Sequence, residues 1–102
     1  MDRYTFGSSK AAQNLVNILQ EPRYNQYSKR VARLLSKQST ILKEINTIHN
    51  KTIREATLKM WHEHFVVLCS SLPEIVRTHT LCVETAWYRQ LLRKIKIKFQ
   101  TR

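Results

Sequence analysis

A helical pattern of mainly apolar residues runs from about residue 27 to residue 72 of this chain. Its members are spaced alternately by three and four residues, as on one face of an α-helix. They are Val31, Leu34, Gln38, Ile41, Ile45, Ile48 and Thr52, and then Leu58, Trp61, Phe65, Leu68 and Leu72. One helix over these residues would be roughly 69 Å long, whereas a compact domain of this size has a radius of gyration of only about 13 Å. We therefore expect this helix either to break or to extend beyond the rest of the domain.

The pattern changes register near its middle. A strict heptad would next place Glu55 and Lys59 on the apolar face, but the apolar residues stand at Ala56 and Leu58. We expect a change of helical twist, or a break, near residues 51–56.

Capping signals indicate where the other helices begin and end. Ser8 or Ser9 can cap a first helix, because a serine oxygen can accept a hydrogen bond from an unpaired amide of the first turn. Pro22 ends this helix. Asn25 or Ser28 can begin the second helix.

A third helix begins after residue 71. Ser71 and Glu74 have the spacing of a capping box, and Pro73 is tolerated in a first helical turn. We predict an all-α, single-domain protein over residues 1–102, with three principal helices at about 9–20, 26–70 and 72–98. The last two form an elongated, coiled-coil-like antiparallel hairpin, in which a turn near Leu72 brings Trp61 close to Val83.

The charge of the chain is strongly positive. Eighteen Lys and Arg residues oppose seven acidic ones, and the net charge is +11. A field of this sign attracts polyanions such as nucleic acid, acidic protein surfaces or anionic lipid. The candidate polyanion-binding residues are Arg30, Arg33, Lys37, Arg89, Arg93, Lys94, Lys96 and Lys98. The alternative is an ordinary solvated surface, because amphipathic helices normally carry Lys and Arg on their outer face.

The usual elements of a catalytic site are missing. The chain has one glycine and one aspartate, Asp2, and no phosphate-binding glycine loop. Its glutamates, which include Glu84, are spread along helices, where ordinary pairing with residues four positions away explains them. We predict no enzymatic activity, no cofactor and no small-molecule substrate.

The histidines and cysteines do not have the spacing of a metal site. His79 and Cys82 share a helix face, and His62 could approach them from a facing helix. Cys69 lies seven residues from His62, which is about 10 Å along a helix, so a fourth ligand is missing. We predict no metal site and place both cysteines, in reduced form, in the core.

One short segment is similar to a known motif. Ala86-Trp87-Tyr88-Arg89-Gln90-Leu91-Leu92-Arg93 resembles the leucine-tyrosine-arginine motif of small, basic, three-helix mitochondrial matrix proteins. In that family the motif opens the first helix, near the amino end. Here Trp87 stands in place of the leucine and 15 residues follow it, so we transfer no function from this resemblance.

The apolar pattern is longer than so small a domain can cover, because a chain of this length buries only about two thirds of its surface. The residues that we expect to bind a partner lie where the basic end of the returning helix would arrive; they are Tyr24, Tyr27, Val31, Leu34, Leu35 and Ile41. We predict a non-catalytic interaction or adaptor subunit that binds a protein partner, or a second copy, by helical packing. The alternative is a nucleic-acid-binding protein that uses the basic helix flank and the basic carboxyl-terminal segment.

No segment is apolar for long enough to span a bilayer, since the longest apolar run is Phe65 to Cys69. The amino-terminal residues lack the pattern of a secretory signal. We expect an intracellular protein of the nucleus or cytoplasm. The mitochondrion is the alternative, because residues 3–37 contain seven basic residues and only one acid, Glu21.

Overall fold

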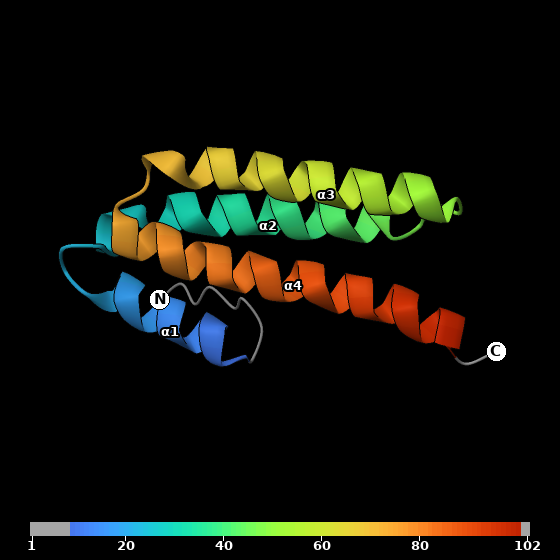
Figure 1. The fold of residues 1–102 in the computed structure, drawn as a ribbon. Helices are drawn as coiled ribbons and strands as arrows, with labels where there is room; N and C mark the ends of the chain where they lie inside the picture. The colour runs from blue at the N-terminus through green and yellow to red at the C-terminus, as the bar shows by residue number, and fades with distance from the viewer. Residues whose placement is uncertain (1–8, 101–102) are drawn as a thin grey trace.

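The computed structural model describes residues 9–100, and the side chains of residues 9–92. These residues form four α-helices, α1 (Lys10–Gln20), α2 (Ser28–Ile45), α3 (Lys51–Leu68) and α4 (Glu74–Gln100), with short 3-10 helices η1 (Asn25–Tyr27) and η2 (Cys69–Ser71). Consecutive helices run in opposite directions; α2, α3 and α4 pack on one another, and α1 packs on α4 (Figure 1). The extents of this bundle are 50 × 24 × 21 Å. The predicted all-α class is confirmed.

The number of helices differs from the prediction. The helix expected over residues 26–70 is two helices, α2 and α3, which fold back on each other. The described residues therefore contain four principal helices, not three. Residues 46–50 form the turn, just before the predicted range of 51–56. The predicted antiparallel hairpin around residue 72 does form, but from α3 and α4.

Local hydrogen bonds and burial explain this break. The Asn50 side chain accepts a hydrogen bond of 3.0 Å from the Ile53 amide and so caps α3. The Arg54 guanidinium donates to the Ile48 carbonyl at 2.6 Å and holds the turn against α3. Folding back also lets Leu42 of α2 pack in one cluster with Leu58 of α3, whereas a straight helix would keep these two residues apart.

The first helix follows its capping signal. The Ser9 hydroxyl accepts a hydrogen bond of 3.2 Å from the Ala12 amide, so Ser9 is the cap of the predicted pair Ser8 and Ser9. The Ser28 hydroxyl, at the start of α2, donates to the Leu19 carbonyl at 3.4 Å. This bond links the carboxyl end of α1 to the beginning of α2.

The core consists of two clusters. The first contains residues from all four helices: Ala12, Leu15, Leu19, Val31, Leu35, Phe65, Cys69, Leu72, Val76 and Val83. The second contains Leu42, Ile45 and Leu58, with Trp61, Trp87 and Leu91 among the partly buried residues packed on it. Helix α1 contributes to the first cluster alone, because its 11 residues extend about 16 Å against about 40 Å for the 27 residues of α4. The bundle thus has a four-helix half and a three-helix half.

Candidate functional site

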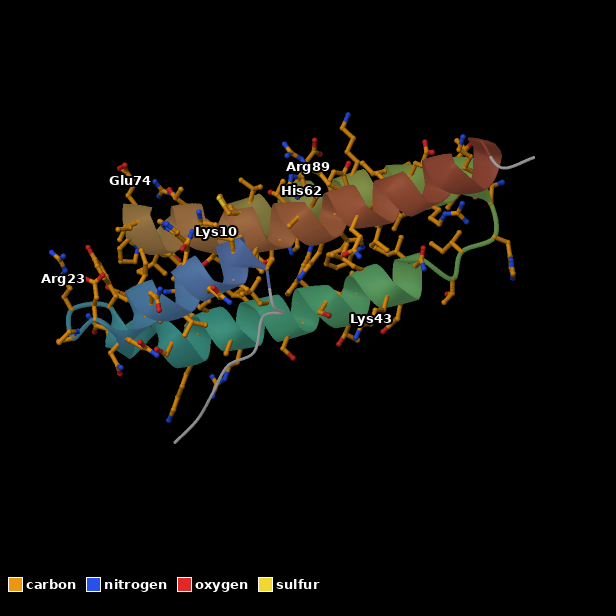
Figure 2. All side chains as sticks on the ribbon, turned by 90° about the horizontal axis from the view of Figure 1, so that it is seen from below. Lys10, Arg23, Lys43, His62, Glu74 and Arg89 are labelled. Atoms are coloured by element: carbon orange, nitrogen blue, oxygen red, sulfur yellow. The ribbon has the colours of Figure 1, made fainter. Side chains whose placement is uncertain are left out.

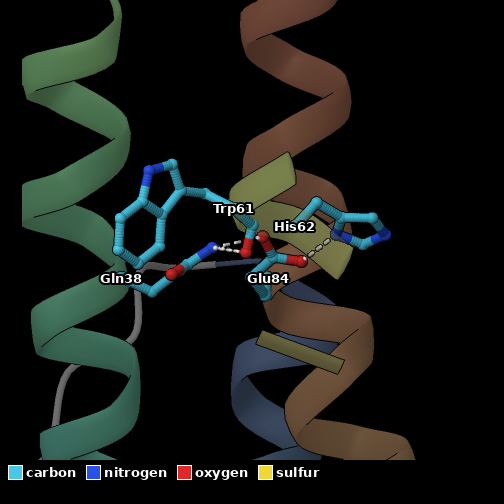
Figure 3. Close-up of polar contacts among 4 residues, drawn as sticks. All are labelled: Gln38, Trp61, His62 and Glu84. Carbon is cyan, nitrogen blue, oxygen red and sulfur yellow. Dashed lines mark hydrogen bonds and ion pairs between the residues drawn. The ribbon is translucent and has the colours of Figure 1, made fainter. Parts of the chain in front are cut away.

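A polar layer crosses the apolar core. Gln38 of α2, His62 of α3 and Glu84 of α4 meet there (Figure 3). Gln38 Nε2 donates to Glu84 Oε2 at 3.0 Å and to the Trp61 backbone carbonyl at 3.2 Å. His62 Nδ1 lies 2.6 Å from Glu84 Oε1. Both oxygens of the fully buried Glu84 carboxyl group therefore have a partner, as a buried polar group requires.

The polar layer lies at the boundary between the two core clusters. Along α2, Gln38 stands between Leu35 of the first cluster and Leu42 of the second. Along α4, Val83 belongs to the first cluster, and Trp87 packs against both. Sliding one of these helices along another would separate the polar groups from these partners while keeping them in the core, so the layer favours this alignment.

Glu84 corrects an interpretation of the sequence, because it is a buried residue and not a member of ordinary surface pairs. A signal for this position was present. Gln38 belongs to the apolar pattern of residues 27–72, and Glu84 follows the buried residues Val76 and Thr80 at intervals of four. Polar residues at core positions of facing helices indicate a buried hydrogen-bonded layer. The contact between His62 and Glu84 agrees with the predicted alignment of the hairpin.

The His62 ring is fixed on two sides. It stacks on Tyr88 with ring centroids 4.5 Å apart and planes 10° apart. Its second nitrogen points away from Glu84 (Figure 3). Burial raises the pKa of the Tyr88 phenol, and the carboxylates of Glu63, Glu84 and Glu55 raise it further. Tyr88 therefore remains a neutral aromatic partner of His62 at neutral pH.

The two cysteines occupy different environments. Cys69 is buried, as predicted, whereas Cys82 is exposed and not a core residue. Burial raises the pKa of the Cys69 thiol from 9.0 to about 11; the Glu84 carboxylate adds to this shift and Arg30 opposes it. Within the described residues, no group of three His, Cys, Asp or Glu side chains could hold a metal ion.

The basic residues of α2 lie along its exposed face. They are Lys29, Arg30, Arg33, Lys37 and Lys43, with Glu44 as the acidic residue of this helix. The Arg30 guanidinium also donates to the Ser71 hydroxyl of η2. Arg89 is exposed on α4, and Figure 2 shows Lys43 and Arg89 at opposite edges of the bundle.

Of the predicted polyanion-binding residues, Arg30, Arg33 and Lys37 are exposed on α2, and Arg89 is exposed on α4. The other four belong to α4 but lie outside the residues whose side chains are described; they are Arg93, Lys94, Lys96 and Lys98.

The predicted partner-binding residues are largely covered by the chain itself. Val31 and Leu35 are buried in the first core cluster, so they offer no surface to a partner, contrary to our expectation. Tyr24, Tyr27, Leu34 and Ile41 are half-buried. Because the chain turns back at residues 46–50, the beginning of α4 lies at the amino end of α2 (Figure 1). The basic carboxyl end of α4 lies at the opposite end of the bundle.

Comparison of this chain with protein-family models, with curated proteins and with solved structures finds no match in any of the three. Among the described residues, none of the helices combines the length and the apolar composition that a membrane span requires.

A second apolar stripe, which the sequence interpretation missed, lies on the outer face of α3. Ile53, Met60 and Val67 are 54%, 54% and 66% exposed. They are spaced by seven residues, so they lie almost in line along the helix. The buried Leu58 and Phe65 stand five residues after Ile53 and Met60, about 140° around the helix. The stripe therefore faces away from the core.

Charged residues on α3 are nearly balanced. This helix carries three basic and two acidic residues, whereas α2 carries five basic and one acidic. Lys59 and Glu63, both exposed, stand on the same flank of the stripe. The outer face of α3 is thus apolar and close to electrically neutral on a strongly basic protein.

Proposed function

We propose that this chain is a non-catalytic helical interaction protein that binds another polypeptide through the outer face of α3. One observation carries this proposal: among residues 9–92, five of the six exposed large hydrophobic side chains belong to α3. They are Ile53, Met60, Val66, Val67 and Leu68. Scattered apolar residues are normal on protein surfaces, but a concentration on one helix is typical of a surface that another helix covers.

The charge distribution supports a protein partner for this face. A nucleic acid would be attracted to the basic face of α2 and not to a nearly neutral apolar stripe. A helical partner would bury Ile53, Met60 and Val67 by helix-in-groove or helix-on-helix packing. The polar layer at Gln38 and Glu84 would serve this function indirectly, by holding α3 in one alignment against α2 and α4.

Site-specific photo-cross-linking tests this proposal. A photoreactive phenylalanine analogue in place of Met60, introduced in cells that express the chain, should form a covalent adduct with a polypeptide after irradiation. The matched control carries the same analogue in place of Gln13, an exposed polar residue of α1, and should form no such adduct. The proposal is wrong if position 60 forms no polypeptide adduct, or only the adducts that position 13 also forms.

A second function is favoured by a different observation. Five basic side chains of α2, from Lys29 to Lys43, are exposed on one helix, and such a face can neutralise the phosphates of RNA or DNA. Binding of labelled oligonucleotides, followed by fluorescence anisotropy, should then weaken steeply as salt rises. Replacing Arg30, Arg33 and Lys37 together by Gln should reduce the slope of this salt dependence, and a flat salt response would exclude this function.

A further inference from the structure

The occupant of the α3 face can be inferred from its symmetry, on the basis of the proposed function. Apolar residues stand at Met60 and seven positions before and after it, at Ile53 and Val67. In an antiparallel pair of helices related by a two-fold axis at Met60, each residue faces the one equally distant on the other side of Met60. Met60 then faces Met60 of the second copy, and Ile53 faces Val67 of the second copy. Each of the three resulting layers therefore contains an apolar side chain from both copies.

The charges on the flank of the stripe are also self-complementary. A two-fold axis between antiparallel helices places the same flank of each helix together. Glu63 lies three residues after Met60 and Lys59 lies one residue before it. Glu63 and Lys59 of the second copy are therefore only about 3 Å apart along the helix axis. Two equivalent ion pairs result, which fix the alignment more than they strengthen the contact.

We propose that two copies of this chain associate through their α3 helices, packed antiparallel about a two-fold axis at Met60. The face is accessible, because α3 forms one edge of the bundle, with α2 and α4 on its inner side (Figure 1). The near balance of charge on α3 also lets this face meet its own copy with less repulsion than the basic face of α2 would generate.

The expected contact is small. A helix of 18 residues is about 27 Å long and about 10 Å wide, so one pair of helices gives an interface at the low end of the usual size range. We therefore expect a reversible dimer that forms at micromolar concentrations and not a permanent one.

Cysteine cross-linking tests the proposed alignment. In a Cys82→Ser background, which removes the exposed native thiol, Met60→Cys should form a covalent dimer on oxidation, because residue 60 faces itself. Ile53→Cys alone should not, since its two copies would be about 21 Å apart along the axis. A mixture of the Ile53→Cys and Val67→Cys chains should cross-link. Dimers from Ile53→Cys alone would indicate a parallel contact and overturn the proposal.

A charge exchange supplies a second, independent test. Lys59→Glu and Glu63→Lys should each weaken self-association measured by sedimentation equilibrium, because like charges then face each other on the shared flank. The double variant should restore the association of the native chain. The matched control, Lys37→Glu on α2, should not weaken it, and circular dichroism should show that every variant retains its helices.

The outcomes separate this inference from the proposed function. A native chain that remains monomeric at high micromolar concentration, while the analogue at position 60 still cross-links to a different polypeptide, overturns the dimer and leaves the interaction function standing. A monomeric chain whose position 60 captures nothing overturns both. A dimer that Met60→Glu does not dissociate overturns the assignment of the contact to α3.

Discussion

The side chains of Gln38, His62 and Glu84 depend on one another, because each satisfies polar atoms that the core would otherwise separate from water. Removing a single member should therefore destabilise the fold more than replacing the whole group by apolar residues. The remaining members would stay buried, or half-buried in the case of His62, without their partners.

Glu84→Ala should reduce the free energy of unfolding by about 2–4 kcal/mol, because it removes the partner of His62, leaves the Gln38 amide with the Trp61 carbonyl as its acceptor, and creates a cavity. The double variant Gln38→Leu, Glu84→Leu should cost less than the sum of the two single Leu variants, since neither polar group then remains alone. Chemical denaturation of the four chains measures this difference. Strict additivity would show that the two residues act independently.

The raised pKa of Cys69 predicts a loss of stability at alkaline pH. The unfolded thiol loses its proton near 9.0, whereas the folded thiol keeps it up to about 11. Unfolding therefore releases a proton in this range, and the free energy of unfolding decreases as pH rises from 9.0 to about 11. Melting temperatures of the native chain should decrease more steeply over this range than those of Cys69→Ala. Equal slopes would contradict the assignment to Cys69.

At the scale of helices and turns, the cap of α1 was predictable, whereas the cap of α2 and the main turn were not. Helix α2 begins without a side-chain cap hydrogen bond, so neither Asn25 nor Ser28 caps it as expected. Ser9 caps α1 as its sequence indicates, because a cap is decided by residues three positions apart. The turn at 46–50 depends on which apolar residues of α2 and α3 can pack together. This packing depends on the positions of all the helices in the bundle, which a local sequence pattern does not contain. The Asn50 cap is a local signal for this turn, but the periodic apolar pattern around it favoured a continuous helix.

Asn50→Ala should lower the free energy of unfolding by about 1 kcal/mol, because the Ile53 amide loses its acceptor at the start of α3. Asn46→Ala, an exposed position in the same turn, should change it by less than about 0.5 kcal/mol. Thermal or chemical denaturation of both variants tests the assignment. Equal effects of the two substitutions would mean that the Asn50 side chain does not cap α3.

The second stripe of α3 shows the same limit on prediction. Ile53, Met60 and Val67 follow a regular helical spacing, and so do Leu58 and Phe65. A sequence with two apolar stripes does not show which one the core buries, because the answer depends on where α2 and α4 lie. The structure places Leu58 and Phe65 inside, which leaves the other stripe outside.

At the scale of the whole molecule, the net charge of +11 affects the strength with which this chain binds any charged partner, including a second copy. Two copies repel each other, and salt screens this repulsion over a Debye length of about 10 Å at 0.1 M. The dimer should therefore become stronger as salt rises, whereas binding of nucleic acid to the α2 face should become weaker. Sedimentation equilibrium and fluorescence anisotropy over one salt series test both. A dimer that dissociates on adding salt would mean that ion pairs, and not the apolar layers, hold it together.

Because α1 is much shorter than α4, one end of the bundle is covered by fewer helices than the other. Partial unfolding should therefore begin at that end. Beyond the polar layer, α4 rests on α2 and α3 alone, over a cluster with only three buried apolar residues, Leu42, Ile45 and Leu58, among those described. We therefore expect opening to start at the end that carries the 46–50 turn and to stop at Gln38 and Glu84. The half enclosed by all four helices should then remain closed after the other half has separated.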